Sequence, residues 1–180
     1  WAKLNENTNK IVQFLKGRKI KQKDRIAAYM PNTIETVEAF ISTTSIGAIW
    51  SSCSPDFGVK GVIERFSQIN PKVLFITDQY FYNGKKINVL ERLPKILKAI
   101  PSIKSVVIVN YPGQNFLKNN KKLHKIKIFK WTELMKVNYQ NMVYSNFDFE
   151  HELAILYSSG TTGKPKCICH RAGGVLIQHK

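Results

Sequence analysis

A short segment near the end of the chain contains residue types that suit the binding of phosphate groups. Residues 157–166, Tyr-Ser-Ser-Gly-Thr-Thr-Gly-Lys-Pro-Lys, follow an apolar stretch and combine Ser and Thr hydroxyls with two glycines and two lysines. Glycine permits positive φ, which lets backbone N–H groups converge on an anion. The hydroxyls add short hydrogen-bond donors and the lysines add positive charge. The segment therefore predicts a loop that wraps around the phosphates of a nucleoside triphosphate.

Two other interpretations of this segment can be compared with that prediction. The common P-loop, G-x-x-x-x-G-K-[ST], does not fit, because Ser158 stands five residues before Gly163 and Pro165 follows Lys164. An ordinary turn between two strands is the simpler alternative, since Gly, Ser and Thr favour turns for conformational reasons. Ten consecutive positions in one pattern favour a phosphate-binding loop over such a turn.

The decapeptide resembles the phosphate-binding signature of the adenylate-forming superfamily, which includes acyl-CoA synthetases, luciferases and the adenylation domains of peptide synthetases. Residues 47–58, Gly-Ala-Ile-Trp-Ser-Ser-Cys-Ser-Pro-Asp-Phe-Gly, resemble the acetoacetyl-CoA synthetases within that superfamily. Further segments that fit this family are residues 62–66, 68–75, 80–85 and 170–175. The resemblance covers most of the chain and is weakest over residues 113–130.

The resemblance implies an acid–thiol ligase that uses ATP. Such enzymes activate a carboxylate, here acetoacetate, to an acyl-adenylate with release of pyrophosphate, and then form a thioester with CoA. Mg²⁺ is expected, because it binds phosphate oxygens with few protein ligands. The residues implied to hold the β- and γ-phosphates are Ser158, Ser159, Gly160, Thr161, Thr162, Gly163, Lys164 and Lys166. For Lys166, a solvent-facing position is the alternative.

A second group of residues is implied to approach CoA. Ser51, Ser52 and Lys85 stand at the matching positions, with Lys85 near the nucleotide phosphates. For the two serines, pairing with backbone at the end of a strand is an equally good interpretation. His170 is interpreted as a structural residue, because no carboxylate partner is evident. No catalytic residue and no metal ligand is assigned within the chain.

The resemblance also implies that the chain is incomplete. It begins at Trp1 and stops inside an apolar-periodic segment, so residues 1–180 are expected to be part of an N-terminal AMP-binding domain that is truncated at both ends. The C-terminal domain, the acyl pocket and the ribose contact are expected outside it, and the isolated chain is predicted to be inactive. Acetyl- or propionyl-CoA synthetase and a non-catalytic nucleotide-binding remnant are the alternative functions. Oligomeric state is not predicted.

Charge raises an alternative of another class, a basic nucleic-acid-binding module. The net charge is +16, from 28 basic and 12 acidic residues, and basic clusters fall within residues 16–25 and 118–130. Only five of the 28 are arginine, the residue suited to bidentate phosphate and base contacts. The clusters also lack interleaved aromatic residues for base stacking. Nucleic-acid binding is therefore disfavoured.

Cysteine usage and hydropathy predict a cytoplasmic protein. Cys53, Cys167 and Cys169 form an odd set without a disulfide framework. Cys167 and Cys169 lack a second ligand pair at zinc-site spacing, and their alternation on a strand predicts packing on one face instead. No apolar run approaches the ~20 residues that a membrane span needs, and no signal peptide is evident.

Hydrophobic periodicity and turn residues predict the elements that position these segments. Strands are expected at 24–30, 48–52, 72–77, 106–109, 126–129, 152–157 and 167–170. Helices are expected at 3–16, from the N-cap Thr33, from Ser54-Pro55-Asp56, at 88–100 with an interruption at Pro94, at 132–137 and from 173. Residues 111–122 are expected as a polar loop. The alternation predicts an α/β fold, with a mostly parallel sheet and flanking helices.

Overall fold

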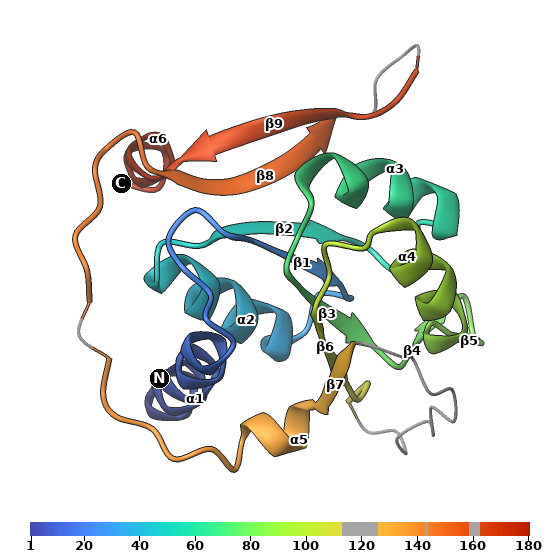
Figure 1. Cartoon of the computed structure of the whole chain (residues 1–180), viewed down its shortest axis with the longest axis horizontal. Coiled ribbons are helices and arrows are strands. Elements are labelled where there is room, and N and C mark those ends of the chain that lie inside the picture. The colour runs from blue at the N-terminus through green and yellow to red at the C-terminus, as the bar shows by residue number, and fades with distance from the viewer. Residues whose placement is uncertain (113–125, 143, 159–162) are drawn as a thin grey trace.

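A computed structural model describes residues 1–112, 126–142, 144–158 and 163–180 (Figure 1). The strands are β1 (Arg25–Tyr29), β2 (Ile49–Cys53), β3 (Val73–Thr77), β4 (Gln79–Tyr82), β5 (Lys85–Asn88), β6 (Ser105–Val109), β7 (Lys127–Lys130), β8 (Glu152–Ser158) and β9 (Lys166–Arg171). The helices are α1 (Ala2–Gly17), α2 (Ile34–Ser45), α3 (Val59–Ile69), α4 (Leu93–Ala99), α5 (Trp131–Leu134) and α6 (Ala172–Gln178), with a 3₁₀ turn, η1 (Leu90–Arg92), before α4.

Among these residues, seven strands form one sheet in the order β7-β6-β3-β1-β2-β8-β9. Every neighbouring pair is parallel except β8 and β9, which run antiparallel at one margin. Strands β4 and β5 form a separate hairpin. The predicted α/β class with a mostly parallel sheet is confirmed.

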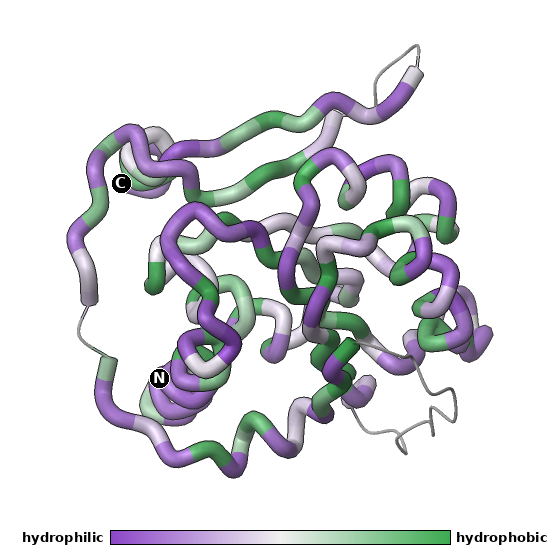
Figure 2. Tube along the Cα trace, viewed as in Figure 1, coloured by the Kyte–Doolittle hydropathy of each residue, from purple (hydrophilic) through white to green (hydrophobic). Residues whose placement is uncertain are grey.

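The sheet separates two hydrophobic cores, because successive strand residues point to opposite faces. In β1, Ala27 and Tyr29 pack with α3 and α4, whereas Ile26 and Ala28 pack with α1, α2 and α5. Figure 2 shows the hydrophobic residues concentrated in the central strands, with hydrophilic residues more frequent in the helices and connections. Buried apolar residues on both faces explain why these strands read as continuous apolar runs in the sequence.

The order of the connections creates a branch point beside β1. Strand β1 leads into α2 on one face, and its neighbour β2 leads into α3 on the other face (Figure 1). In open parallel sheets, the connections that diverge in this way leave a crevice at the carboxyl ends of the strands, where ligands bind. Because β8 is parallel to β2, its last residue, Ser158, lies at the same edge of the sheet.

Two local predictions between β2 and α4 are corrected by the structure. Helix α3 begins at Val59 after the N-cap Gly58, not at the expected segment Ser54-Pro55-Asp56. The Ser54 hydroxyl donates to Asp56 Oδ2 (2.7 Å) and accepts from the Asp56 N–H, so these residues close a turn instead. Residues 85–88, whose last position was expected to begin a helix, form β5, and α4 begins later, at Leu93, with Pro94 in its first turn.

Elsewhere the predicted elements agree with the structure within one to two residues at most of their ends. Thr33 precedes α2 at the N-cap position, although its side chain makes no capping hydrogen bond to the helix backbone. Most of the expected polar loop at 111–122 lies outside the described residues. No helix among the described residues is both long and apolar enough to span a lipid bilayer.

Candidate nucleotide-binding site

The predicted phosphate loop joins the two antiparallel strands at the margin of the sheet. Ser158 pairs with Lys166 at the last position of the β8–β9 ladder, so both ends of the loop lie side by side. Ser159, Gly160, Thr161 and Thr162 lie outside the described residues. Gly163 has φ +115°, a conformation that residues with a side chain rarely adopt. The glycine at this position is thus explained by backbone geometry.

The positive charges of the loop are available to an anion. Lys164 and Lys166 are both exposed, and Pro165 between them is buried. Neither lysine forms an ion pair within the part of the chain that the structure describes. A charged donor on each side of a fixed proline is a suitable arrangement for a polyanion.

Ser51 lies in the interior of the sheet and not on an open surface. It is fully buried, and its hydroxyl donates to the Ile155 carbonyl at 2.7 Å. Its Oγ also lies 2.9 Å from the Tyr157 hydroxyl oxygen. Burial raises the pKa of Tyr157, so this phenol stays protonated at neutral pH. The contacts match the backbone-pairing interpretation of Ser51: the residue ties β2 to the strand that carries the phosphate loop.

The other two residues expected near CoA occupy more open positions. Ser52 is half-buried near the carboxyl end of β2, beside Ala28 of β1. Lys85 is exposed and begins β5, directly after the turn formed by Asn83 and Gly84. No hydrogen bond or ion pair joins Lys85 to Ser51 or Ser52 in the part of the chain that the structure describes. The structure thus places Ser52 within β2 and Lys85 in the β4–β5 hairpin, on separate elements.

A cavity of about 240 Å³ lies at the branch point of the sheet. It is lined by residues 30–32 after β1, residues 54–56 after β2 and residues 80–82 of β4. Tyr82 of this lining is exposed, and Asp56 contributes a carboxylate. The cavity therefore lies where the sheet topology predicts a ligand. Residues 54–56 and 80–82 of its lining are close in sequence to the predicted CoA residues Ser52 and Lys85, which do not line it themselves.

A partly buried hydrogen-bond network supports one wall of this cavity and was not found by sequence reasoning. The Arg92 Nη1 donates to the Pro55 carbonyl at 2.7 Å and to the Phe57 carbonyl at 3.2 Å, and it also contacts the Tyr29 hydroxyl. Tyr29 donates to the Phe57 carbonyl at 2.5 Å. The turn after β2 is thus held by residues from β1 and η1. Contacts between residues this far apart in the sequence leave no local pattern.

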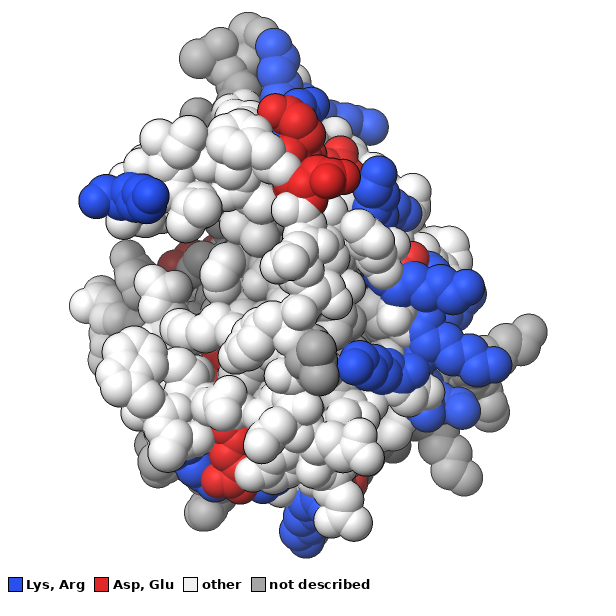
Figure 3. Space-filling model, turned by 90° about the vertical axis from the view of Figure 1, so that its left-hand side faces the viewer, with Lys and Arg blue, Asp and Glu red and all other residues white. Residues whose placement is uncertain are grey.

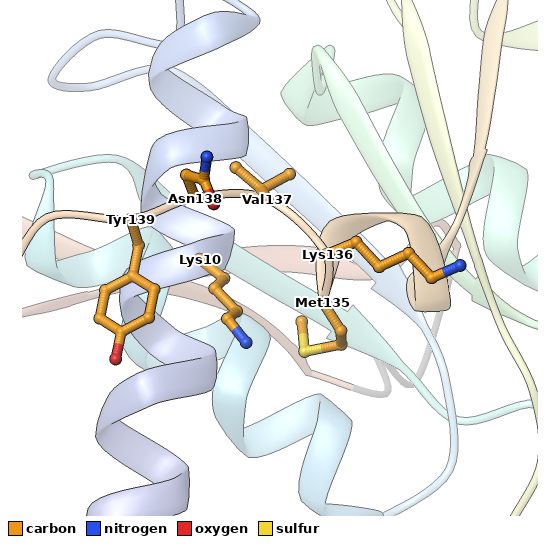
Figure 4. Close-up of a pocket in the computed structure, with 6 residues that line it drawn as sticks. All are labelled: Lys10, Met135, Lys136, Val137, Asn138 and Tyr139. Atoms are coloured by element: carbon orange, nitrogen blue, oxygen red, sulfur yellow. The ribbon is translucent and has the colours of Figure 1, made fainter.

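A second cavity, of about 390 Å³, is lined by Lys10 and residues 135–139 (Figure 4). It separates α1 from the segment after α5, with Lys10 on the helix and Met135 and Tyr139 on the segment (Figure 4). The Lys10 ammonium lies 5.7 Å from the centre of the Tyr139 ring and pairs with Glu6 at 2.5 Å. Its charge is already compensated, so the cavity offers no free cation from this lysine.

The three cysteines differ in burial: Cys53 is buried, whereas Cys167 and Cys169 are exposed. Burial raises the pKa of Cys53 to about 12, so its thiol stays protonated. Cys167 and Cys169 are exposed on β9, and the expectation that they pack is wrong for the described residues. No group of three His, Cys, Asp or Glu side chains in these residues is placed to hold a metal ion.

Figure 3 shows the face near α6 with few charges at its centre and Lys and Arg along one margin.

Comparison with known proteins identifies the class to which this fold and loop belong. The family model for AMP-binding enzymes matches residues 1–180, and the chain therefore belongs to the AMP-binding enzyme family. The expected membership of the adenylate-forming superfamily is thereby confirmed.

Individual relatives narrow the similarity to one kind of enzyme. The chain is 42% identical over 183 residues to the acetoacetyl-CoA synthetase of Xenopus tropicalis, and 40% identical over 179 residues to that of Rhizobium meliloti. Each alignment covers 99% of this chain and 27% of the relative. The structure of an acetoacetyl-CoA synthetase from Streptomyces lividans matches with a TM-score of 0.88 and 32% identity, over 99% of this chain and 26% of that one. The resemblance to acetoacetyl-CoA synthetases is confirmed, and the chain spans about a quarter of the length of these relatives.

Proposed function

We propose that this chain provides the phosphate-binding part of an AMP-forming acetoacetate–CoA ligase. The reaction is attack of the acetoacetate carboxylate on the α-phosphorus of ATP, departure of pyrophosphate, and transfer of the acyl group from AMP to the CoA thiol. The observation that carries the proposal is the loop between β8 and β9. Its described ends, Ser158 and Lys166, pair at the carboxyl end of β8, in a chain that matches the AMP-binding family throughout.

The chemistry of the loop fits a departing pyrophosphate. Charge accumulates on the pyrophosphate oxygens as the bond to the α-phosphorus breaks, and donors already in place stabilise that charge. Lys164 and Lys166 supply cations, and the Ser158 hydroxyl supplies a donor. We assign the same role to Ser159, Gly160, Thr161, Thr162 and Gly163 on the basis of the motif.

The donor set fits anions and not a bare cation, so protein ligands for Mg²⁺ are not assigned among the described residues. Mg²⁺ would be held through the phosphate oxygens and would neutralise part of their charge. For CoA, Ser52 and Lys85 remain the proposed contacts, and a cavity lined by residues 54–56, which follow Ser52 in the chain, supports that assignment. For Ser51, the contacts of its hydroxyl favour a structural role.

The remaining parts of the proposal concern the whole protein. Residues 1–180 are proposed to be part of an N-terminal AMP-binding domain, and the location is proposed to be the cytoplasm. The acid is the least constrained element, because a malonamoyl-CoA synthetase of Penicillium aethiopicum is also 36% identical over the full chain. Acetyl- and propionyl-CoA synthetase remain the alternatives within the class, because the acyl pocket is expected outside this chain.

Acid-dependent exchange of pyrophosphate into ATP by the complete gene product that contains this chain tests the proposal. Acetoacetate should support exchange, and acetate and propionate should support it poorly. Exchange with acetate but not with acetoacetate would show that acetate is the substrate. Absence of exchange with any acid would favour a nucleotide-binding remnant. The 180-residue chain alone should show no ligase turnover.

A further inference from the structure

We propose that Gln68 is a positioning residue that holds the two lysines of the phosphate loop in place, an inference that rests on the proposed function. Gln68 lies near the end of α3, whereas the loop lies 97 residues later in the sequence. Its side-chain amide nitrogen donates to the Pro165 carbonyl at 2.9 Å. Pro165 is the buried residue between Lys164 and Lys166.

The contacted carbonyl controls the course of the chain between the lysines. The proline ring fixes φ near −65°, so the orientation of the Pro165 carbonyl depends on ψ alone. A donor on that oxygen therefore restricts the one remaining soft dihedral at this residue. Because ψ of Pro165 sets the direction in which the backbone of Lys166 leaves the loop, the hydrogen bond restricts the relative direction of the two lysine backbones, from which the side chains extend.

The Gln68 amide is itself oriented by the helix. The same nitrogen donates to the Glu64 carbonyl at 2.7 Å, so both of its N–H groups are used. The side-chain amide of an exposed glutamine on a helix ordinarily points into water and makes no contact with the rest of the protein. Here the side chain bridges a helix end and a loop, and the second hydrogen bond limits its rotation before the loop is engaged.

A second residue on the same face of α3 holds the other end of the loop. Arg65, three residues before Gln68, lies with its guanidinium carbon 5.8 Å from the centre of the Tyr157 ring and 4.1 Å from that of Phe57. Residues three apart share one face of a helix. One face of α3 thus contacts Tyr157, just before the loop, and Pro165, within its last residues. The helix, and not only the β8–β9 pairing, sets the loop against the sheet.

The test replaces Gln68 by Met, which keeps the length of the side chain and removes both donors, in the complete gene product. Ser67→Ala is the matched control, because Ser67 is exposed on the same helical turn. Pyrophosphate exchange gives KM for ATP, KM for the acid and kcat, and thermal unfolding gives Tm. We expect KM for ATP to rise about 3- to 10-fold, the range of one net hydrogen bond, with KM for the acid and Tm as in the control.

Two results would overturn the inference. An unchanged KM for ATP in Gln68→Met would show that the contact does not act on the loop. A lower Tm together with equal losses in every kinetic constant would show a purely structural role. The lysine variants test the proposed function separately. If Lys164→Ala and Lys166→Ala leave ATP affinity unaltered, the proposed function fails, independently of the result for Gln68→Met.

Discussion

Replacing Ser51 by Ala distinguishes the two roles that its sequence position allows. The substitution removes the hydrogen bond to the Ile155 carbonyl and the contact with the Tyr157 hydroxyl, both inside the sheet. A buried polar group left without a partner costs about 1–3 kcal/mol. We expect Ser51→Ala to lower the free energy of unfolding by that amount and to leave KM for CoA unchanged.

A double-mutant cycle with Tyr157→Phe measures the coupling between the two hydroxyls. If they interact as the 2.9 Å separation indicates, the double variant should be less destabilised than the sum of the single variants, by about 0.5–1.5 kcal/mol. Urea denaturation followed by circular dichroism supplies the free energies of unfolding. Additive effects would refute the interaction, and unchanged stability with a higher KM for CoA would show that Ser51 contacts substrate.

Three further predictions concern the loop and the α1–α2 interface. Lys164→Ala and Lys166→Ala should each weaken ATP binding about 10- to 100-fold in equilibrium titrations, the range for hydrogen bonds to charged groups, with unchanged Tm; wild-type affinity would contradict the assignment. Gly163→Ala places a side chain at φ +115° and should weaken ATP binding through strain of about 1–3 kcal/mol, against Gly174→Ala as a control with open space at its Cβ. Burial raises the pKa of Glu38, so the folded state favours the neutral form of this carboxyl group. The free energy of unfolding should therefore decline as pH rises from the ordinary glutamate pKa through the raised one, and Glu38→Gln should remove this decline. Identical pH profiles of the free energy of unfolding for the wild type and Glu38→Gln would refute the prediction.

The sequence predicted those features that local patterns encode. The N-cap position of Thr33, the apolar runs of the central strands and the glycine of the loop each follow from a rule about neighbouring residues. The β4–β5 hairpin also had such a signal, because Asn83 and Gly84 form the two-residue turn that this dipeptide favours, but residues 80–85 were interpreted only through their resemblance.

One local pattern allowed two outcomes: the Ser54 hydroxyl bonds Asp56 within a turn, which competes with the helix start that the same residues predict. Other features depend on contacts between distant segments, and the sequence could not show them. The partners of Arg92 come from β1 and from the turn after β2, and the partner of Gln68 comes from the phosphate loop. The placement of Ser51 against β8 likewise required the order of the strands.

Strand β9 has β8 as its single neighbour among the described residues, which leaves one row of its backbone groups open at the margin of the sheet. Leu156 of β8 and Ile168 of β9, which pair across this ladder, remain 44% and 45% exposed. An open, partly apolar edge is a template on which another chain can add a strand. Arg171 at the end of β9 pairs with Glu150, but Lys166 at its start forms no ion pair among the described residues, and the whole chain carries a net charge of +16. Preparations of this 180-residue chain should therefore stay dispersed at low ionic strength and self-associate as salt screens that charge.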